Sequence, residues 1–402
     1  MKQERLLERE KSIYNKVDAP CQYFGRCGGC ALQDLAYEDQ LRLKHQRLQR
    51  IFAELGAVPA FDIVGLEEPW RYRNKAEFTF GTVDGVIVLG YHAAGSFWRV
   101  IDLDDCLLLP EPVMRMLRDL LALVRQTELP AYQPRSHQGF FRYAVVRYSH
   151  ATQQVMLCLV TASGAREVAE RLAVSVCRRH PAIAGMFWGV TDRLADVAQP
   201  ERLTLVHGSP WLEEQVGPFR LTLGPLSFLQ PTLAQAERLY AALDETLADA
   251  AGGVAWDLYC GVGVIALYLS RSFDTVYAID SEPAHVELAA KNAIANGVTN
   301  VDYRAGRVEE LLRDRRVWLG PAKPDVIVVD PPRAGLHSSA IASILSARPK
   351  RLAYISCNAQ SLVRDLRLLS SSFPRYRLSH LRAFDMFPQT NHVETLAVLQ
   401  RQ

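Results

Sequence analysis

No apolar run in this sequence approaches the length of a membrane-spanning helix, and the first residues, Met1-Lys2-Gln3-Glu4-Arg5, are charged where a signal peptide is apolar. The chain also lacks a strong excess of either charge, since its formal net charge is only +2. These absences argue against membrane and secreted proteins, and they predict a cytoplasmic globular protein. Its 402 residues provide for two or three domains.

Acidic residues are absent from one long stretch, between Leu129 and Arg166, which is rich in arginine. A basic surface of this kind is compatible with phosphate binding, although a solvated surface explains the charge equally well. The same part of the chain mixes aromatic and basic residues, as in Trp70–Lys75 and Phe97–Val100. Such rings can stack on unpaired bases, or they can fill the core of a sheet, which we favour for Phe78 and Phe80.

Three of the eight cysteines, Cys21, Cys27 and Cys30, lie within ten residues and are interleaved with glycine. In a reducing compartment such a group indicates a metal site, and glycine allows the backbone to wrap closely around it. The spacing favours an iron–sulfur centre over zinc, because structural zinc sites usually pair their cysteines two and two. Cys106 is the best placed fourth ligand. Its rivals lie in apolar, periodic stretches typical of a core: Cys158 and Cys177.

Apolar residues run into Asp257, and Tyr259 and the glycines Gly261 and Gly263 follow before a helical pattern begins. This is the start of a βαβ unit, in which the glycines allow a ligand to approach the backbone. The next strand ends on Asp280, about twenty residues further on, where an acid can bind the hydroxyls of a ribose. A turn with two glycines is more typical of S-adenosylmethionine binding than of dinucleotide binding, whose fingerprint has three glycines.

Strands and helices alternate after Asp280, which predicts a doubly wound α/β sheet. Two polar motifs follow predicted strands, at the sheet edge where ligands bind in such folds: Asp330-Pro331-Pro332-Arg333-Ala334-Gly335 and Tyr354-Ile355-Ser356-Cys357-Asn358. A third motif, Phe384 to Glu394, precedes the last predicted strand.

These three motifs together resemble the RNA (uracil-5-)-methyltransferase family, which makes 5-methyluridine in ribosomal and transfer RNA. The resemblance covers nearly the whole chain, including the cysteine segment, Arg73-Asn74-Lys75 and Phe228–Gln230. Some members carry a small N-terminal barrel, the TRAM domain, for which there is no room before Cys21. The resemblance is therefore strongest to the 23S rRNA branch that lacks this domain, with tRNA methylation as the alternative.

The resemblance implies a role for each motif. Cys357 is the nucleophile that adds to carbon 6 of uracil, and Glu394 is the base that later removes the proton from carbon 5. S-adenosylmethionine is the methyl donor, and four residues lie against it or the uracil: Gln230, Tyr259, Asp280 and Asp330. A 4Fe–4S cluster would be held by four cysteines: Cys21, Cys27, Cys30 and Cys106.

The predicted fold is α/β, with a C-terminal Rossmann-like methyltransferase domain over residues 226–402. An N-terminal arm, iron–sulfur segment and basic helix occupy residues 1–60, and a mainly β RNA-binding domain occupies residues 61–225. We expect a monomer that binds structured RNA and no membrane. The competing hypotheses are a non-catalytic RNA-binding protein of this fold and an enzyme that methylates base nitrogens. The latter places an aromatic after Asp-Pro-Pro, where this chain has Arg333.

Overall fold

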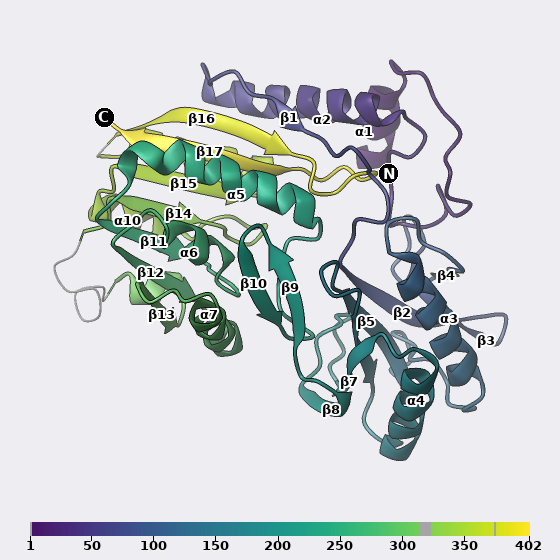
Figure 1. Cartoon of the computed structure of the whole chain (residues 1–402). Coiled ribbons are helices and arrows are strands. Elements are labelled where there is room, and N and C mark those ends of the chain that lie inside the picture. The colour runs from purple at the N-terminus through teal and green to yellow at the C-terminus, as the bar shows by residue number, and fades with distance from the viewer. Residues whose placement is uncertain (1, 314–322, 374) are drawn as a thin grey trace. The chain divides into compact units, whose positions relative to one another are not determined.

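The computed structural model describes residues 2–313, 323–373 and 375–402. The chain forms two compact units, which are considered separately (Figure 1). Unit 1 comprises Met1–Tyr37, Glu68–Gln215 and Thr222–Leu226, and unit 2 comprises Glu38–Glu67, Val216–Leu221 and Ser227–Gln402. Among the described residues, no helix has both the length and the apolar character needed to cross a membrane.

Unit 1 is built on a seven-stranded sheet of order β4-β3-β2-β5-β6-β7-β8. All neighbouring strands are antiparallel except β6 and β7, which are parallel and connected through a helix. The strands are β2 (Lys75–Val83), β3 (Val86–His92), β4 (Val100–Asp102), β5 (Phe141–Tyr148), β6 (Val155–Thr161), β7 (Ile183–Val190) and β8 (Arg202–Gly208). Every residue of β5 and β6 is buried, as expected for central strands covered on both faces.

The helices of unit 1 are α1 (Lys2–Lys11), α3 (Glu111–Arg125) and α4 (Arg166–Arg179). Phe78 and Phe80 of β2 are each 1% exposed, so the prediction that they belong to the core is confirmed. Phe97 and Trp98, in contrast, are 85% and 58% exposed in the loop between β3 and β4. Strands β9 (Leu212–Val216) and β10 (Phe219–Leu223) follow β8 in sequence and form a small sheet of their own.

Unit 2 contains an eight-stranded sheet of order β1-β16-β17-β15-β14-β11-β12-β13. The strands are β1 (Ile63–Val64), β11 (Val254–Leu258), β12 (Thr275–Asp280), β13 (Val301–Ala305), β14 (Val326–Val329), β15 (Arg351–Ser356), β16 (Tyr376–Phe384) and β17 (Glu394–Arg401). Strands β11 to β15 are mutually parallel, whereas β17 runs antiparallel to both β15 and β16. The sheet is therefore mixed, with its reversed strand beside β15.

Helices cover both faces of this sheet. They are α2 (Tyr37–Phe52), α5 (Leu233–Leu247), α6 (Val264–Leu269), α7 (Pro283–Ala295), α8 (Val308–Leu311), α10 (Ser338–Ala347) and α11 (Ala359–Ser371), with short 3-10 turns η1 (Ala53–Leu55) and η2 (Ala248–Ala250). Buried side chains of α2, α10 and α11 join one apolar core with the sheet, and α5, α6 and α7 lie on the other face (Figure 1). This three-layer arrangement confirms the predicted Rossmann-like α/β fold.

Candidate active site

Five of the predicted site residues converge on one edge of the unit 2 sheet. Tyr259, Asp330 and Cys357 each come directly after a parallel strand, and Asp280 is the last residue of β12. Glu394 begins β17, and because β17 is antiparallel to β15 its first residue lies at the edge where β15 ends. Ser356 pairs with Thr395, which puts Cys357 and Glu394 one position beyond this pair on adjacent strands.

Cys357 sits in the tight turn from β15 to α11, and its two neighbours hold that turn. The Asn358 amide donates to Ser356 Oγ at 3.1 Å, and the Asn358 side chain accepts a hydrogen bond from the Gln360 amide at the start of α11. Asn358 Nδ2 also donates to the carbonyl of Arg333 at 2.9 Å. This last bond ties the Cys357 motif to the Asp330–Gly335 motif.

Two carboxyl groups lie close enough to Cys357 to affect its titration. Burial, with the charges of Glu394 and Asp330, raises the pKa of the Cys357 thiol to about 11 against the opposing charge of Arg333. A nucleophilic cysteine needs a lowered pKa, and from the sequence Arg333 is a candidate to supply the positive charge that lowers it. Arg333 does act in that direction, but burial and the two acids outweigh it, so the thiol is protonated at neutral pH.

Glu394 and Asp330 interact strongly with each other. Burial and the Asp330 charge raise the pKa of Glu394 well above its ordinary value, and Arg333 opposes the rise only partly. Burial also raises the pKa of Asp330. Glu394 is 1% exposed, and within the described chain its Oε1 atom has no hydrogen-bond partner. A buried carboxyl group with one unpaired oxygen and a raised pKa is a strong base once it is ionised.

The glycine turn after β11 provides the expected place for a nucleotide. Tyr259, Gly261 and Gly263 all have positive φ angles, and the space beside Gly261 is open. The Gly261 amide donates to Asp280 Oδ2 at 2.9 Å. Burial alone would raise the pKa of Asp280, but bonds from His285 and from the Glu282 and Gly261 amides bring it below the ordinary value. Asp280 is therefore an ionised acceptor beside the turn.

Asp257, in β11, is a buried acid next to the glycine turn to which the sequence interpretation assigned no role. It is fully buried, and neither of its oxygens has a hydrogen-bond partner in the described part of the chain. Burial and the Asp330 charge raise the pKa of Asp257 well above its ordinary value. The nearby Ala266 amide acts to lower this pKa, although it is not placed to form a hydrogen bond. An unsatisfied buried acid beside the glycine turn fits a cationic ligand such as the sulfonium and ammonium groups of S-adenosylmethionine.

Gln230 is buried in the segment before α5, close in sequence to Thr232, whose hydroxyl donates to the Met386 carbonyl at 2.7 Å. The structure thus joins the Gln230 segment to the motif that precedes Glu394. Tyr240 of α5 is buried against the Tyr268 ring, and after burial the Asp330 and Glu394 charges raise its pKa most strongly. From the sequence, Tyr240 could not be distinguished from the other buried apolar residues of α5.

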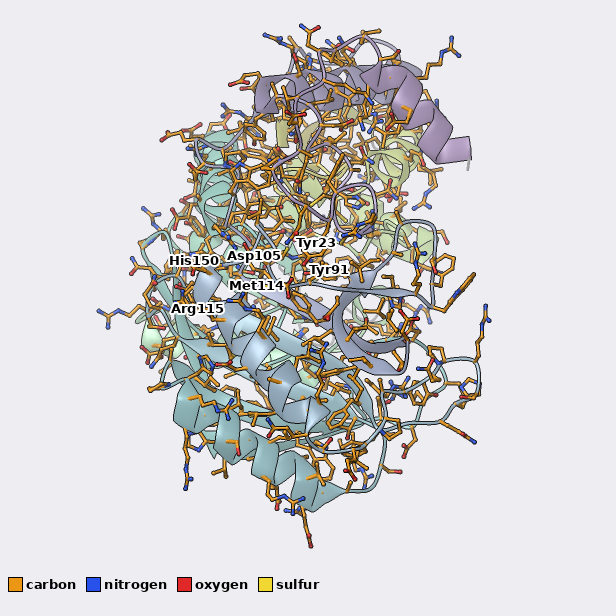
Figure 2. All side chains as sticks on the ribbon, turned by 90° about the vertical axis from the view of Figure 1, so that its right-hand side faces the viewer. Tyr23, Tyr91, Asp105, Met114, Arg115 and His150 are labelled. Atoms are coloured by element: carbon orange, nitrogen blue, oxygen red, sulfur yellow. The ribbon has the colours of Figure 1, made fainter. Side chains whose placement is uncertain are left out.

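The four predicted metal ligands all belong to unit 1. Residues 26–28 pair with residues 92–94, which lays the glycine-rich segment against Tyr91 at the end of β3, labelled with Tyr23 and Asp105 in Figure 2. Cys106 is brought to this region because Arg71 and Arg73 donate backbone hydrogen bonds to Leu107 and Leu108. Arg71 also forms a two-pronged ion pair with Asp105, at 2.6 and 2.8 Å.

Burial raises the pKa of the Cys30 thiol to about 12 and that of Cys106 to about 11, and each of these two also responds to the charges of Cys21 and Cys27. Arg73 lowers the pKa of Cys106, and the Gly29 amide donates to Cys27 Sγ at 3.4 Å. Cys30 and Cys106 thus lie in a desolvated setting, within range of the charges of the other two cysteines. In the described residues, however, no three cysteine, histidine or acidic side chains are arranged to hold a metal ion.

Comparison with known proteins agrees with this geometry. Residues 219–402 match the family model described as tRNA (Uracil-5-)-methyltransferase. Uncharacterized RNA methyltransferases of Halalkalibacterium halodurans and Clostridium tetani are 31% and 32% identical to this chain. These matches cover 98% and 99% of the chain and 86% and 87% of the two relatives.

A solved structure is similar over nearly the whole chain. It is the Pyrococcus abyssi tRNA (uracil-54, C5)-methyltransferase in complex with S-adenosyl-L-homocysteine, with a TM-score of 0.73 and 26% sequence identity. The match covers 93% of this chain and 86% of that one. Fold and site thus define an S-adenosylmethionine-dependent methyltransferase. More narrowly, the chain belongs to the RNA (uracil-5-)-methyltransferase family.

Proposed function

We propose that this protein methylates carbon 5 of a uridine in a structured RNA, with Cys357 as the nucleophile and Glu394 as the base. One observation carries the proposal. Strand β15 ends beside the start of the antiparallel strand β17, so the Cys357 thiol and the buried Glu394 carboxyl lie at the same sheet edge. Carbon 5 of uracil is too weak a nucleophile by itself. A thiolate must first add to carbon 6.

The proposed steps follow from these two groups. The Cys357 thiolate forms a bond to carbon 6, and the ring becomes an enolate whose carbon 5 takes the methyl group. Glu394 then removes the carbon 5 proton, the ring double bond re-forms, and the carbon–sulfur bond breaks to release the thiolate. The raised pKa of Glu394 makes its carboxylate a stronger base for this step.

Bound S-adenosylmethionine supplies the methyl group on a positively charged sulfonium. Tyr259, Asp280 and Asp257 would line its pocket, with Asp280 accepting from the ribose hydroxyls and Asp257 facing positive charge. Gln230 and Asp330 would lie between this pocket and the uracil ring. Positive charge brought into the site would also favour the thiolate form of Cys357.

Two substitutions test the mechanism. Cys357→Ala should bind RNA but form no covalent adduct and transfer no methyl group. Glu394→Gln should still form the adduct and accept the methyl group, so a methylated protein–RNA complex should survive denaturing electrophoresis. A folded Glu394→Gln protein that turns over normally would eliminate Glu394 as the base.

The prediction of a 23S rRNA substrate remains a prediction. A tRNA substrate is the second candidate, because the similar solved structure from Pyrococcus abyssi is a tRNA methyltransferase. Methyl transfer to protein-free 23S rRNA and to tRNA transcripts should be compared at the same salt concentration, since phosphate contacts make RNA affinity depend on salt. Clear preference for tRNA would make tRNA, and not 23S rRNA, the favoured substrate.

The exposed rings of Phe97 and Trp98 are the best candidates in unit 1 for contact with unpaired bases. Arg135 lies over the Trp98 ring at 4.6 Å, so positive charge accompanies the aromatic surface. This pair comes from the two parts of the sequence that predicted RNA binding, the acid-free stretch and the aromatic–basic mixture. Ring stacking and phosphate attraction together fit single-stranded RNA.

We also propose that Cys21, Cys27, Cys30 and Cys106 hold one 4Fe–4S cluster. The support is the pairing of residues 26–28 with residues 92–94, the influence of Cys21 and Cys27 on Cys30 and Cys106, and the positive charge of Arg73 beside Cys106. Thiolates are the ligands that such clusters require. Protein purified without oxygen should contain iron and sulfide, and stoichiometric zinc with neither would contradict the assignment.

A further inference from the structure

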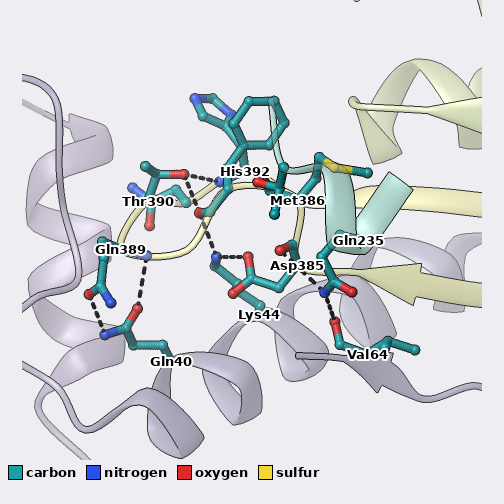
Figure 3. A network of polar contacts seen from close by, with 12 residues as sticks. Gln40, Lys44, Val64, Gln235, Asp385, Met386, Gln389, Thr390 and His392 are labelled. Carbon is teal, nitrogen blue, oxygen red and sulfur yellow. Dashed lines mark hydrogen bonds and ion pairs between the residues drawn. The ribbon is translucent and has the colours of Figure 1, made fainter. Parts of the chain in front are cut away.

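Helix α2 makes buried polar contacts with the loop that joins β16 to β17, residues 385–393, called here the β16–β17 loop (Figure 3). Lys44 Nζ donates to Asp385 Oδ1 at 2.5 Å and to the Phe387 carbonyl at 3.1 Å. The side chains of Lys44 and Asp385 are both 0% exposed. Along the sequence, these partners are more than 300 residues apart.

Gln40 lies one turn before Lys44 on the same face of α2 and holds the next part of the loop. Its Nε2 donates to Gln389 Oε1 at 2.9 Å, and its Oε1 accepts from the Gln389 amide at 3.2 Å. Gln389 is buried and has a φ of 69°, a left-handed conformation that is unfavourable for glutamine. The two bonds from Gln40 compensate for this strain.

The loop is anchored from other directions as well. Asp385 and Gln235 meet at the Val64 carbonyl, which accepts from the Asp385 amide at 2.9 Å and from Gln235 Nε2 at 2.5 Å. Near the end of the loop, Thr390 Oγ1 accepts from the His392 amide, and Arg333 donates to His392 Nδ1 at 3.0 Å. These contacts hold the loop from Asp385 to His392, two residues before Glu394.

A buried ion pair is not the simplest way to stabilise this contact. Removing two charges from water is costly, and well-packed apolar residues of similar size often stabilise a protein equally well. A charged pair with defined hydrogen bonds does, however, hold the two segments in a single orientation. That property matters where a loop must deliver a reacting group to a fixed place.

We propose that Lys44 and Gln40 of α2 are positioning residues that, through the β16–β17 loop, set the place of Glu394 relative to Cys357. This inference rests on the proposed function, since it assigns the two residues to the proton-removal step. They act through the loop and touch neither substrate nor cofactor. Because proton transfer needs close approach, a shift of about 1 Å can slow a reaction on the order of 100-fold.

The test compares three variants with the wild-type protein. Lys44→Met removes the cation that faces Asp385 and can impair folding, so a second variant, Lys44→Met with Asp385→Asn, removes both charges together. Arg42→Met is the matched control, because the Arg42 side chain is exposed on α2 and pairs with Asp39 of the same helix. Each variant is assayed for methyl transfer to RNA, for trapped adduct and for amide hydrogen exchange.

In the double variant we expect kcat to fall by about 10- to 100-fold with KM for S-adenosylmethionine unchanged within twofold. Methylated protein–RNA adduct should accumulate, and the amides of residues 386–393 should exchange faster while those of residues 259–263 do not. A folded double variant with the kcat of Arg42→Met, or with reduced kcat but unchanged loop exchange, would refute the inference. Wild-type protein that makes no 5-methyluridine would refute the proposed function itself, whatever the exchange rates.

Discussion

Alkylation of Cys357 in the free protein should accelerate about tenfold for each pH unit between pH 7 and pH 10. Only the thiolate reacts, and burial together with Glu394 raises the pKa of this thiol from 9.0 to about 11. A shift of two units reduces the thiolate fraction at a given pH by about 100-fold, so roughly one thiol in a thousand is ionised at pH 8. The partly accessible position of Cys357 still admits a small reagent.

The assay follows iodoacetamide modification of the Cys357 peptide by mass spectrometry, without cofactor or RNA. Two variants test the causes of the shift at pH 9 to 10. Glu394→Gln should increase the rate, because it removes an acid that raises the pKa. Arg333→Gln should reduce it by up to about fivefold, a limit set by the exposed position of the guanidinium. Arg364→Gln is the control on α11.

A rate that reaches its plateau with a midpoint below pH 9 would refute this reasoning. It would show that the thiol is already activated in the free protein, and that burial and the two acids do not control it. Unchanged rates in both Glu394→Gln and Arg333→Gln would equally contradict the electrostatic account.

Three further outcomes can be checked. Gly263→Ala should lower the free energy of unfolding by about 1–3 kcal/mol in urea titrations, because φ is +87° and the new Cβ would lie 2.9 Å from the Ala289 side chain. Asp330→Asn should flatten the loss of stability that the wild type shows between about pH 4 and pH 7. This follows because burial raises the pKa of Asp330 to about 7, so the stabilising proton is lost as the pH rises through that value. Trp98→Ala should weaken RNA binding about fivefold or more in filter-binding assays, and Phe373→Ala, an exposed ring elsewhere, should not.

Much of the fold was predictable because local patterns determined it. The sequence pattern predicts one helix from Leu233 to about Leu247 and another from about Ala36 to Leu55. The structure has the first as α5 and the second as α2 followed by η1. The strands before Asp280, Asp330 and Cys357 were equally clear, since buried parallel strands appear as short apolar runs. These predictions needed no information about distant parts of the chain.

The direction of the last strand was not predictable in this way. An alternating α/β pattern indicates parallel strands, yet β16 and β17 form an antiparallel pair at one side of the sheet. Reversal of β17 is what puts Glu394 at the edge where Cys357 lies. An apolar run has no direction of its own, so only the pairing of strands in the sheet decides this.

The sequence by itself determined which chemical groups this protein carries and which strands they follow, because motif spacing and apolar periodicity are local properties. Only the tertiary structure decided the electrostatic state of those groups. The Cys357 thiol is less acidic than its basic neighbour suggested, because burial and two carboxyl groups act on it together. The sequence likewise predicts that the cations of the basic helix are mostly exposed. For Lys44 this is wrong, because its side chain is fully buried against Asp385. Burial and long-range charge depend on segments hundreds of residues apart, and no local pattern records them.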